Sequence, residues 1–351
     1  MRGKQTKSYL SHGWGLLAIL LPLLTWAEAA PDITLGLENS SRTFFGGRHT
    51  ALNVVVTAEE EADGVLTWEL AIGQRTIRRG EKRVVATRAT PAVVELTMPF
   101  PPVKPGVVIS PELRLSLRRE GRTGPAVDSV ETLRLFPENP FADRREGLEK
   151  NRLALFDPTG KTEQILRDSD VPYEYVRTPL VLESDDKPRT LIVGSGLSFD
   201  DYPELMTTLV RLAALGHAVL CLRPAGRFTM PGSDGSEGAS PQDVRLAQSG
   251  IISELDKQLD LPPWDRQGSV VTTRCRFAAE RALVVCHVEA EAAGAAGAAG
   301  WPWVNMRFQG TGRLLVSGLP IVESWESGPT PRFLFLRILE LLAEPRQNKG
   351  D

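Results

Sequence analysis

The chain has 351 residues, of which 42% are hydrophobic and 24% are charged, a composition typical of a folded globular protein. Its length is sufficient for two hydrophobic cores. The formal net charge of −3 excludes a general electrostatic attraction to nucleic acid or to anionic lipid, so we expect no nucleic-acid partner.

Residues 1–29 have the features of a signal peptide. A basic start with Lys4 and Lys7 precedes the apolar stretch Gly15–Trp26, and Ala27-Glu28-Ala29 supplies the small residues of a cleavage site. The apolar stretch is shorter than the ~20 residues of a transmembrane helix, which favours a cleavable leader. The alternative is an uncleaved leader, which would be the only membrane contact. We expect an exported protein, either periplasmic, at the cell surface or secreted.

Residues 31–137 alternate between apolar and polar side chains with period two, as half-buried strands do. The expected strands are Thr50–Thr57, Gly64–Ile72, Pro91–Met98, Leu113–Arg118 and Val130–Phe136. Turns rich in Gly and Pro separate them, and this pattern of short strands predicts an immunoglobulin-like β-sandwich. Trp68 is expected to fill the space between the two sheets.

Basic residues cluster twice within this half, at Arg75–Arg83 and at Arg118–Arg122. Glu81 and Glu120 interrupt the two runs, and few aromatic residues are interleaved. We interpret both runs as solvated strand faces and turns. A site for a polyanion is the alternative.

Residues 138–151 are polar and contain Pro, and are expected to form a linker. From 152 to 345 strands alternate with helices, which predicts an α/β domain with a parallel sheet, followed by a polar tail at 346–351. The expected strands are Leu153–Phe156, Tyr173–Arg177, Thr190–Val193, Ala218–Leu222 and Arg313–Ser317. The expected helices are Lys161–Arg167, Asp201–Leu215 and Phe333–Leu342.

The chain contains three cysteines. Val270–Phe277 and Arg281–Val288 resemble the arms of a hairpin, and a two-residue turn at Glu280-Arg281 would place Cys275 opposite Cys286. A disulfide between them and two buried free thiols are the alternatives. Cys221 is expected to be buried in a strand. No Cys/His cluster has the spacing of a metal site, so we expect no metal.

The stretch Leu153–Ala343 resembles a class I glutamine amidotransferase-like domain, which has a flavodoxin-like fold. The residues that carry the likeness are Ala154–Thr162, Leu191–Gly196, Gly216–Leu222, Leu259–Trp264 and Gly310–Val316. Versions of this domain follow β-sandwiches in exported bacterial proteins related to glycoside-hydrolase family 2 architectures. The resemblance therefore implies a flavodoxin-like domain behind the sandwich.

The same resemblance argues against amidotransferase activity. An active member has a Cys on a Gly-x-Cys-x-Gly turn after the fourth strand, a place that falls near Arg223. Its His and Glu would fall near Leu319–Ile321, which has neither residue. Only Gly194-Ser195-Gly196, which would supply an oxyanion donor, remains.

Ligands of parallel sheets bind beyond the carboxyl ends of the strands. The groups predicted at this edge are Asp157, Gly194, Ser195, Gly196, Asp200 and Arg223. For Asp200 or Asp201, beside Tyr202-Pro203, helix capping is the favoured role, and Thr159 is expected to cap the helix that follows it. Gly160-Lys161-Thr162 lacks the preceding Gly of a phosphate-binding loop, so no nucleotide or other cofactor is expected.

These observations favour an exported, non-catalytic protein that binds or scaffolds a partner, with a glycan or an envelope protein as the candidate. The first alternative is a carbohydrate-active accessory protein or enzyme, which would need two facing carboxylates among Asp157, Asp200 and Asp201. The second is an amide or ester hydrolase that uses Ser195. No catalytic residue is assigned.

Overall fold

The computed structural model describes residues 32–38, 41–121, 125–226, 241–266, 270–279, 282–290, 302–308 and 310–344. Within these ranges, the side chains of 263, 266 and 270–290 are not described. The leader and the tail that the sequence predicts lie outside the described residues. From Ile33 onward the chain forms one compact unit. It consists mostly of strands, arranged in several sheets, with few helices.

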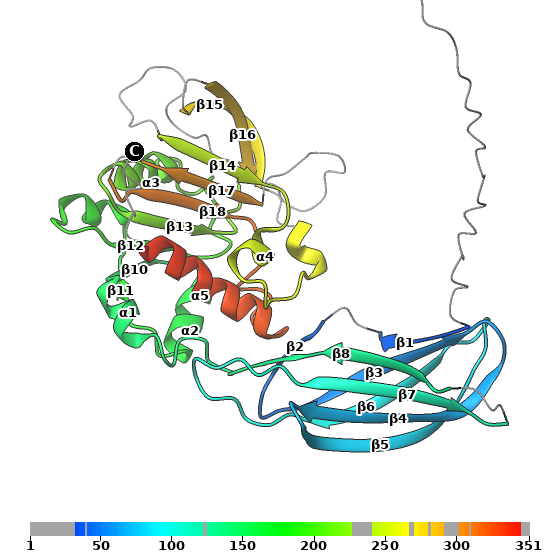
Figure 1. The fold of residues 1–351 in the computed structure, drawn as a ribbon. Coiled ribbons are helices and arrows are strands. Elements are labelled where there is room, and N and C mark those ends of the chain that lie inside the picture. Colours follow the sequence, from blue (N-terminus) through cyan, green and yellow to red (C-terminus); the bar gives the residue numbers. More distant parts are fainter. Residues whose placement is uncertain are drawn as a thin grey trace, which may run out of the picture. The chain divides into compact units, whose positions relative to one another are not determined.

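Two antiparallel sheets form the N-terminal half (Figure 1). The strand orders are β1-β3-β6 and β5-β4-β7-β8. The bounds are β1 Ile33–Leu37, β3 His49–Ala58, β4 Ala62–Ile72, β5 Arg75–Ala86, β6 Ala92–Pro99, β7 Glu112–Arg119 and β8 Val127–Thr132. One hydrophobic cluster joins the two sheets, with Val54 of β3 and Leu66 of β4 fully buried in it. Trp68 packs against this cluster, which confirms its predicted inward position.

Seven strands form a second, mixed sheet in the order β11-β10-β12-β13-β18-β17-β14. The bounds are β10 Leu153–Phe156, β11 Glu174–Tyr175, β12 Thr190–Val193, β13 Ala218–Leu222, β14 Asp243–Ala247, β17 Trp303–Arg307 and β18 Arg313–Ser317. The strands from β11 to β18 in this order are parallel, whereas β17 is antiparallel to β18 and to β14. The sequence predicts the five parallel strands, but it does not predict β17 and β14 at the far edge of the sheet.

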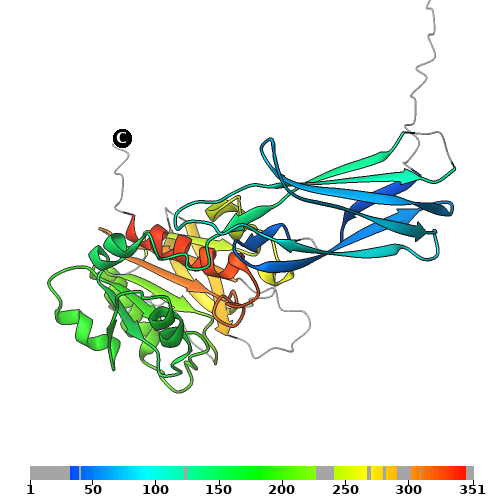
Figure 2. The same cartoon turned by 90° about the horizontal axis from the view of Figure 1, so that it is seen from below.

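Helices cover both faces of the seven-stranded sheet (Figures 1 and 2). They are α1 Arg145–Lys150, α2 Lys161–Asp168, α3 Leu205–Ala214, α4 Ile251–Leu255 and α5 Pro329–Ala343, with 3-10 turns η1 Pro179–Ser184 and η2 Pro263–Arg266. Helix α3 packs on one face, and α2, α4 and α5 pack on the other. The central strands are therefore buried on both sides, which explains their continuous apolar runs. Among the described helices, none is long and apolar enough to cross a membrane.

Two smaller pairings complete the described fold. β2 (Thr43–Phe45) pairs in parallel with β9 (Arg134–Phe136). β15 (Val270–Ala279) and β16 (Ala282–Ala290) form the expected hairpin, and their register places Cys275 opposite Cys286. The predicted register is thus confirmed, while the disulfide itself concerns side chains outside the description.

Asp260, in the loop after α4, holds the segment that leads into β2. Its carboxylate accepts hydrogen bonds from the Ser41 hydroxyl (2.8 Å), from the Thr43 hydroxyl (2.6 Å) and from the backbone N–H groups of Arg42 and Thr43 (both 3.0 Å). A single side chain therefore satisfies four donors of a segment more than 200 residues earlier in the chain.

Candidate functional site at the carboxyl edge of the seven-stranded sheet

Four loops meet at one edge of the seven-stranded sheet, because β10, β12, β13 and β18 are adjacent, parallel and in register. Asp157 follows β10, Gly194-Ser195-Gly196 follows β12, Arg223 follows β13, and Glu323 lies in the loop after β18. The loops after β12 and β13 are themselves joined by a bridge between Ser198 and Ala225. The edge is therefore formed by adjacent loops, two of which are hydrogen-bonded to each other.

Asp157 holds the start of α2. It is 2% exposed, and its Oδ2 accepts the backbone N–H groups of Thr162 (2.8 Å) and Glu163 (2.9 Å). Its Oδ1 accepts the Thr159 hydroxyl at 2.7 Å. Asp157 is thus the main cap of this helix, because its carboxylate reaches the free N–H groups of the first turn, while the predicted cap Thr159 accepts the Lys161 N–H only at 3.5 Å.

Gly194 lies directly against this carboxylate. A methyl group on Gly194 would fall 2.2 Å from Asp157 Oδ1, so only glycine fits without a shift of one of the two. The close approach of Asp157 therefore explains why position 194, predicted at the oxyanion position, is a glycine.

Ser195 is 1% exposed, and its hydroxyl donates to Glu323 Oε1 at 2.7 Å. The Arg223 guanidinium lies 3.5 Å from the same oxygen. The backbone of Arg223 joins its neighbours, with its N–H donating to Ser317 O (2.6 Å) and its carbonyl accepting from Gly196 (3.0 Å). Serine, arginine and glutamate thus form one connected group.

The Arg223 backbone has φ 35°, a conformation that residues other than glycine seldom adopt. Its N–H and carbonyl bonds to the loops after β18 and β12 hold it there. The chain therefore turns sharply after β13, and the Arg223 side chain projects at the edge of the sheet.

Five of the six predicted edge residues come together around this group, namely Asp157, Gly194, Ser195, Gly196 and Arg223. Asp200 lies farther along the loop after β12, beside Gly226, where a methyl would fall 2.8 Å from its Oδ2. The predicted capping by Asp200 or Asp201 is wrong, because α3 begins at Leu205 and its N-cap is Glu204.

Sequence reasoning missed Glu323. The resemblance directs attention to the segment after the last parallel strand, and Glu323 is the first acidic residue there. An acidic residue in that segment is a signal that could have identified it.

Neither histidine whose side chain is described, His49 or His217, lies at this edge. His217 precedes β13, whereas Arg223 follows it, so about 20 Å of extended chain separates the two ends. His49 lies on β3, in the N-terminal half. Cys221 is fully buried in the core, as predicted, and this burial raises the pKa of its thiol. No group of described side chains could hold a metal ion.

A groove of about 730 Å³ adjoins the edge and shares Glu323 with it. Lys161 and Gln164 of α2 line it and are exposed. Trp325, also in the lining, is 8% exposed and stacks on Phe141 with ring centroids 6.4 Å apart. The Arg332 guanidinium donates to the carbonyls of Trp325 (2.9 Å) and Glu138 (3.1 Å). The groove lining therefore combines exposed polar side chains with a buried tryptophan and a buried arginine.

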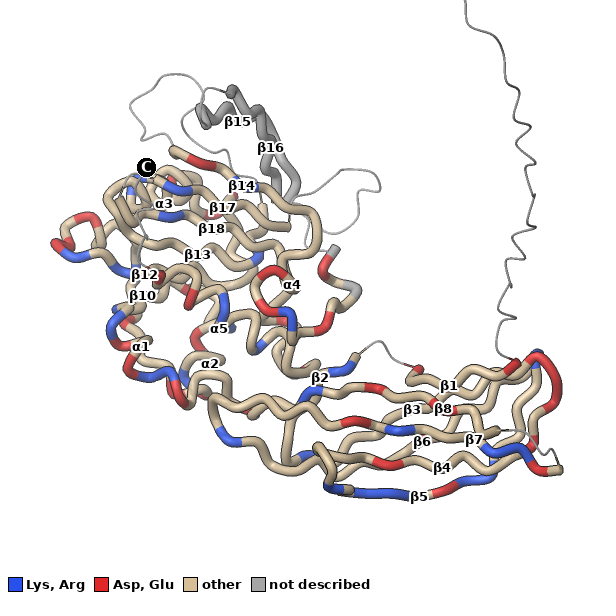
Figure 3. Tube along the Cα trace, in the orientation of Figure 1, with Lys and Arg blue, Asp and Glu red and all other residues tan. Residues whose placement is uncertain are grey.

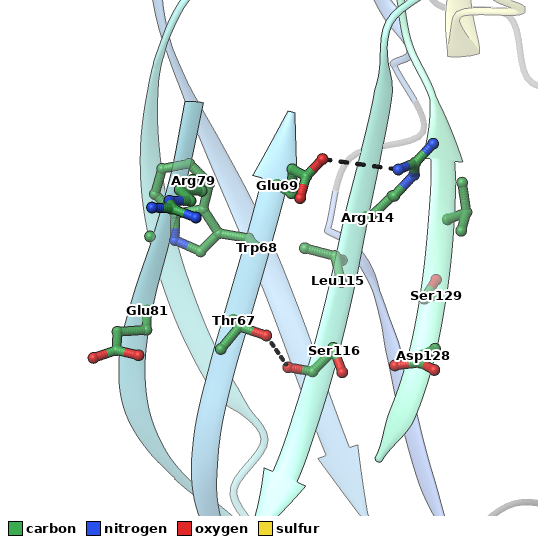
Figure 4. A pocket seen from close by; sticks show the side chains of 12 residues that line it. Thr67, Trp68, Glu69, Arg79, Glu81, Arg114, Leu115, Ser116, Asp128 and Ser129 are labelled. Atoms are coloured by element: carbon green, nitrogen blue, oxygen red, sulfur yellow. Dashed lines mark hydrogen bonds and ion pairs between the residues drawn. The ribbon is translucent and has the colours of Figure 1, made fainter. Parts of the chain in front are cut away.

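A second hollow, of about 750 Å³, lies on the sheet β5-β4-β7-β8 (Figure 4). Within it Glu69 lies 3.8 Å from Arg114, and the Thr67 hydroxyl donates to Ser116 O at 3.3 Å. Its residues come from four neighbouring strands of one sheet, and nothing there resembles a reactive group. We therefore take the carboxyl edge and its groove as the candidate site.

His217 makes the stability of the fold depend on pH. It is 2% exposed, and its Nδ1 accepts the backbone N–H of Arg189 at 3.2 Å. Burial, helped by the charges of Arg189 and Arg152 against that of Asp185, lowers the pKa of His217 below its ordinary value of 6.5. Below pH 6.5 the unfolded chain therefore binds a proton on His217 that the folded chain does not bind. The free energy of unfolding is thus highest above pH 6.5 and decreases as the pH falls below this value.

We expect His217→Gln to flatten this dependence, because glutamine does not titrate. Urea unfolding of both proteins between pH 7.5 and pH 5 measures the effect, and the wild type should lose up to about 1.4 kcal/mol per pH unit more than the variant. Parallel curves for the two proteins would show that His217 does not titrate as described.

No family model matches the chain, and no curated protein is similar to it. Among solved structures, Spo0M, a sporulation control protein from Bacillus subtilis, matches with a TM-score of 0.23 and 13% identity, over 34% of this chain and 54% of that one. A cycloisomaltooligosaccharide glucanotransferase from Paenibacillus sp. matches with a TM-score of 0.24 and 10% identity, over 46% of this chain and 20% of that one. The chain thus spans about half the length of Spo0M. Likenesses this weak establish neither fold nor function.

Proposed function

We propose that this protein is an exported, non-catalytic binding or scaffolding protein with a degenerate class I amidotransferase-like domain. One observation carries the proposal. The Ser195 hydroxyl donates to Glu323, which Arg223 also approaches, and Arg223 occupies the turn where the amidotransferase resemblance requires a cysteine. The edge therefore lacks, among its described side chains, the thiol nucleophile and the imidazole base of amidotransferase chemistry.

The strand order supports the flavodoxin-like part of this proposal. Numbered along the chain, the parallel strands β10, β11, β12, β13 and β18 lie in the order 2-1-3-4-5, which is the flavodoxin-like order. The positive φ of Arg223 supports it further, because a strained turn after the fourth strand is where such enzymes present a nucleophile. The immunoglobulin-like description of the N-terminal half and the two-domain division belong to the same proposal.

Export is proposed from the leader sequence. Its basic start, apolar stretch and small residues at Ala27 and Ala29 support it. Cell fractionation with N-terminal sequencing tests it, because a start at Ala30 would support a cleaved leader, a start at Met1 in the envelope fraction an uncleaved one, and recovery in the cytoplasm alone would refute export.

The groove beside the edge is the proposed ligand site. No hydrogen bond or ion pair joins the side chains of Lys161 and Gln164 to any described residue, so an ammonium group and an amide remain for a ligand. Glu323, which also lines the groove, supplies an acceptor. A hydroxyl-rich ligand such as a glycan suits a rim that offers both donors and acceptors.

The test compares turnover with binding. We expect the purified protein to release no ammonia from glutamine and to hydrolyse neither p-nitrophenyl esters nor p-nitrophenyl glycosides above the buffer rate. On a glycan array it should bind without turnover, and Lys161→Ala/Gln164→Ala should weaken binding by about tenfold. Lys257→Ala, an exposed lysine outside the groove, is the matched control.

Two outcomes would contradict the proposal. Hydrolysis of an ester or amide that Ser195→Ala abolishes would establish the hydrolase alternative, provided that the variant melts at the wild-type temperature. Glycoside turnover abolished by Glu323→Gln would establish the carbohydrate-enzyme alternative.

A further inference from the structure

The strand β5 forms an open edge of the four-stranded sheet. Its neighbour in the sheet is β4, and no described strand pairs with its other side. The pairing with β4 is regular from Arg78 to Ala86, after an irregularity near Ile77. Within these nine residues, alternate ones turn their backbone N–H and C=O groups away from β4, so the outer side of β5 presents a row of unpaired donors and acceptors, as an edge strand does.

This edge carries a concentration of positive charge in a chain whose net charge is −3 (Figure 3). Five cations lie within β5, against the single acid Glu81: Arg75, Arg78, Arg79, Lys82 and Arg83. All five are exposed. Arg83 pairs with Asp63 and Glu120, but no ion pair joins the other four to any described residue.

The cations project from both faces of β5. Arg78 and Lys82 stand opposite the buried Leu70 and Leu66, on the inner face, and Arg79 stands opposite Glu69 on the outer face. Between Arg78 and Lys82, Gly80 is covered by the indole of Trp68, since a methyl there would fall 2.4 Å from Cζ2. An added strand would thus meet cations on either side of its backbone.

Charged edge strands also protect proteins from pairing with unwanted strands. That protection acts against apolar segments, which offer no charge to pair with the cations of β5, and against basic segments, which the cations repel. An acidic segment meets the opposite condition, since its carboxylates would pair with the four unpaired cations while its backbone completes the sheet.

We propose that β5 binds an extended acidic polypeptide segment of a partner, which adds as a strand along Arg78–Ala86. The site is separate from the carboxyl edge, and the proposal does not depend on a ligand there. The partner is a polypeptide because the row of backbone donors and acceptors is satisfied by another backbone, which a polysaccharide does not offer.

The probe is the capped peptide Thr-Val-Thr-Glu-Glu-Lys-Thr-Glu-Glu. In antiparallel pairing it places glutamates opposite the cations from Arg78 to Arg83 and its lysine opposite Glu81. We expect saturable binding to the full chain by fluorescence anisotropy, weakened as salt rises. Arg78→Glu/Lys82→Glu should weaken it by at least about tenfold, whereas Arg118→Glu/Lys104→Glu, which changes the net charge equally elsewhere, should leave it within about twofold.

A second peptide with the same sequence and N-methyl groups on alternate residues keeps every charge but cannot form the strand ladder. Loss of its binding supports strand addition. Equal binding of both peptides, or competition by heparin at equal charge concentration, would show that the edge attracts any polyanion and would overturn the proposal. Absence of binding by the unmodified peptide would overturn it as well.

Discussion

Asp260→Ala is expected to lower the free energy of unfolding by about 3 kcal/mol. The carboxylate accepts four hydrogen bonds from Ser41, Arg42 and Thr43, two of them from hydroxyl groups. Bonds to a charged acceptor contribute more than neutral ones, and alanine would leave all four donors without their partner.

Urea unfolding of the purified chain measures this loss. Lys257→Ala, three residues earlier in the same loop and exposed, is the control and should stay within about 0.5 kcal/mol of the wild type. Asp260→Asn should fall between the two, because the amide oxygen still accepts from the backbone but the charge is gone. An Asp260→Ala protein as stable as the control would mean that water replaces the carboxylate without cost.

Asp157→Ala is expected to cost about 2 kcal/mol, by removing the acceptor that caps α2. Both bonded N–H groups, of Thr162 and Glu163, would lose their partner in a region where Thr162 is fully buried. The control is Asp168→Ala at the other end of α2, where an exposed acid opposes the helix dipole and its removal should be neutral or slightly stabilising.

A double-mutant cycle with Gly194 separates the capping role from general disruption. Gly194→Ala should destabilise the wild type, because its methyl would meet Asp157 Oδ1 at 2.2 Å. In the Asp157→Ala background that obstacle is absent, so the same change should cost less, giving a coupling of about 1 kcal/mol or more. Additive losses would contradict the contact between the two residues.

The central strands could be predicted from the sequence to the residue. Leu153–Phe156, Thr190–Val193, Ala218–Leu222 and Arg313–Ser317 all have the predicted bounds, because strands buried on both faces appear as short continuous apolar runs. Tyr173–Arg177 is reduced to the two residues of β11, an edge strand with one neighbour.

The far edge of the same sheet could not be predicted. Strand β17 includes Asn305 and ends at Arg307, so it lacks a continuous apolar run, and it follows a segment rich in Ala and Gly. Trp303, the first residue of β17, is 2% exposed and packs in the core. The sequence therefore contains no pattern that predicts β17, an antiparallel strand far along the chain from the parallel strand β13.

At the candidate site, the sequence located the loops but not their partners. Asp157, Ser195 and Arg223 could be placed at one edge because each directly follows a parallel strand. The bond between Ser195 and Glu323 joins residues 128 apart, and the loop after β18 has no periodic pattern that fixes which side chain turns inward. Capping by Asp157 was likewise hidden, because Thr159 stands closer to the helix start.

The bonds made by Asp260 span 217 to 219 residues of the chain. During synthesis the strands of the N-terminal half emerge first and can pair with one another. The segment at the start of β2 can nevertheless bond to Asp260 only after the loop that follows α4 has been synthesised. This contact joins residues far apart in the sequence, which raises the contact order and is expected to slow folding. The protein therefore completes its N-terminal half only after residue 260 of its 351 has been translated.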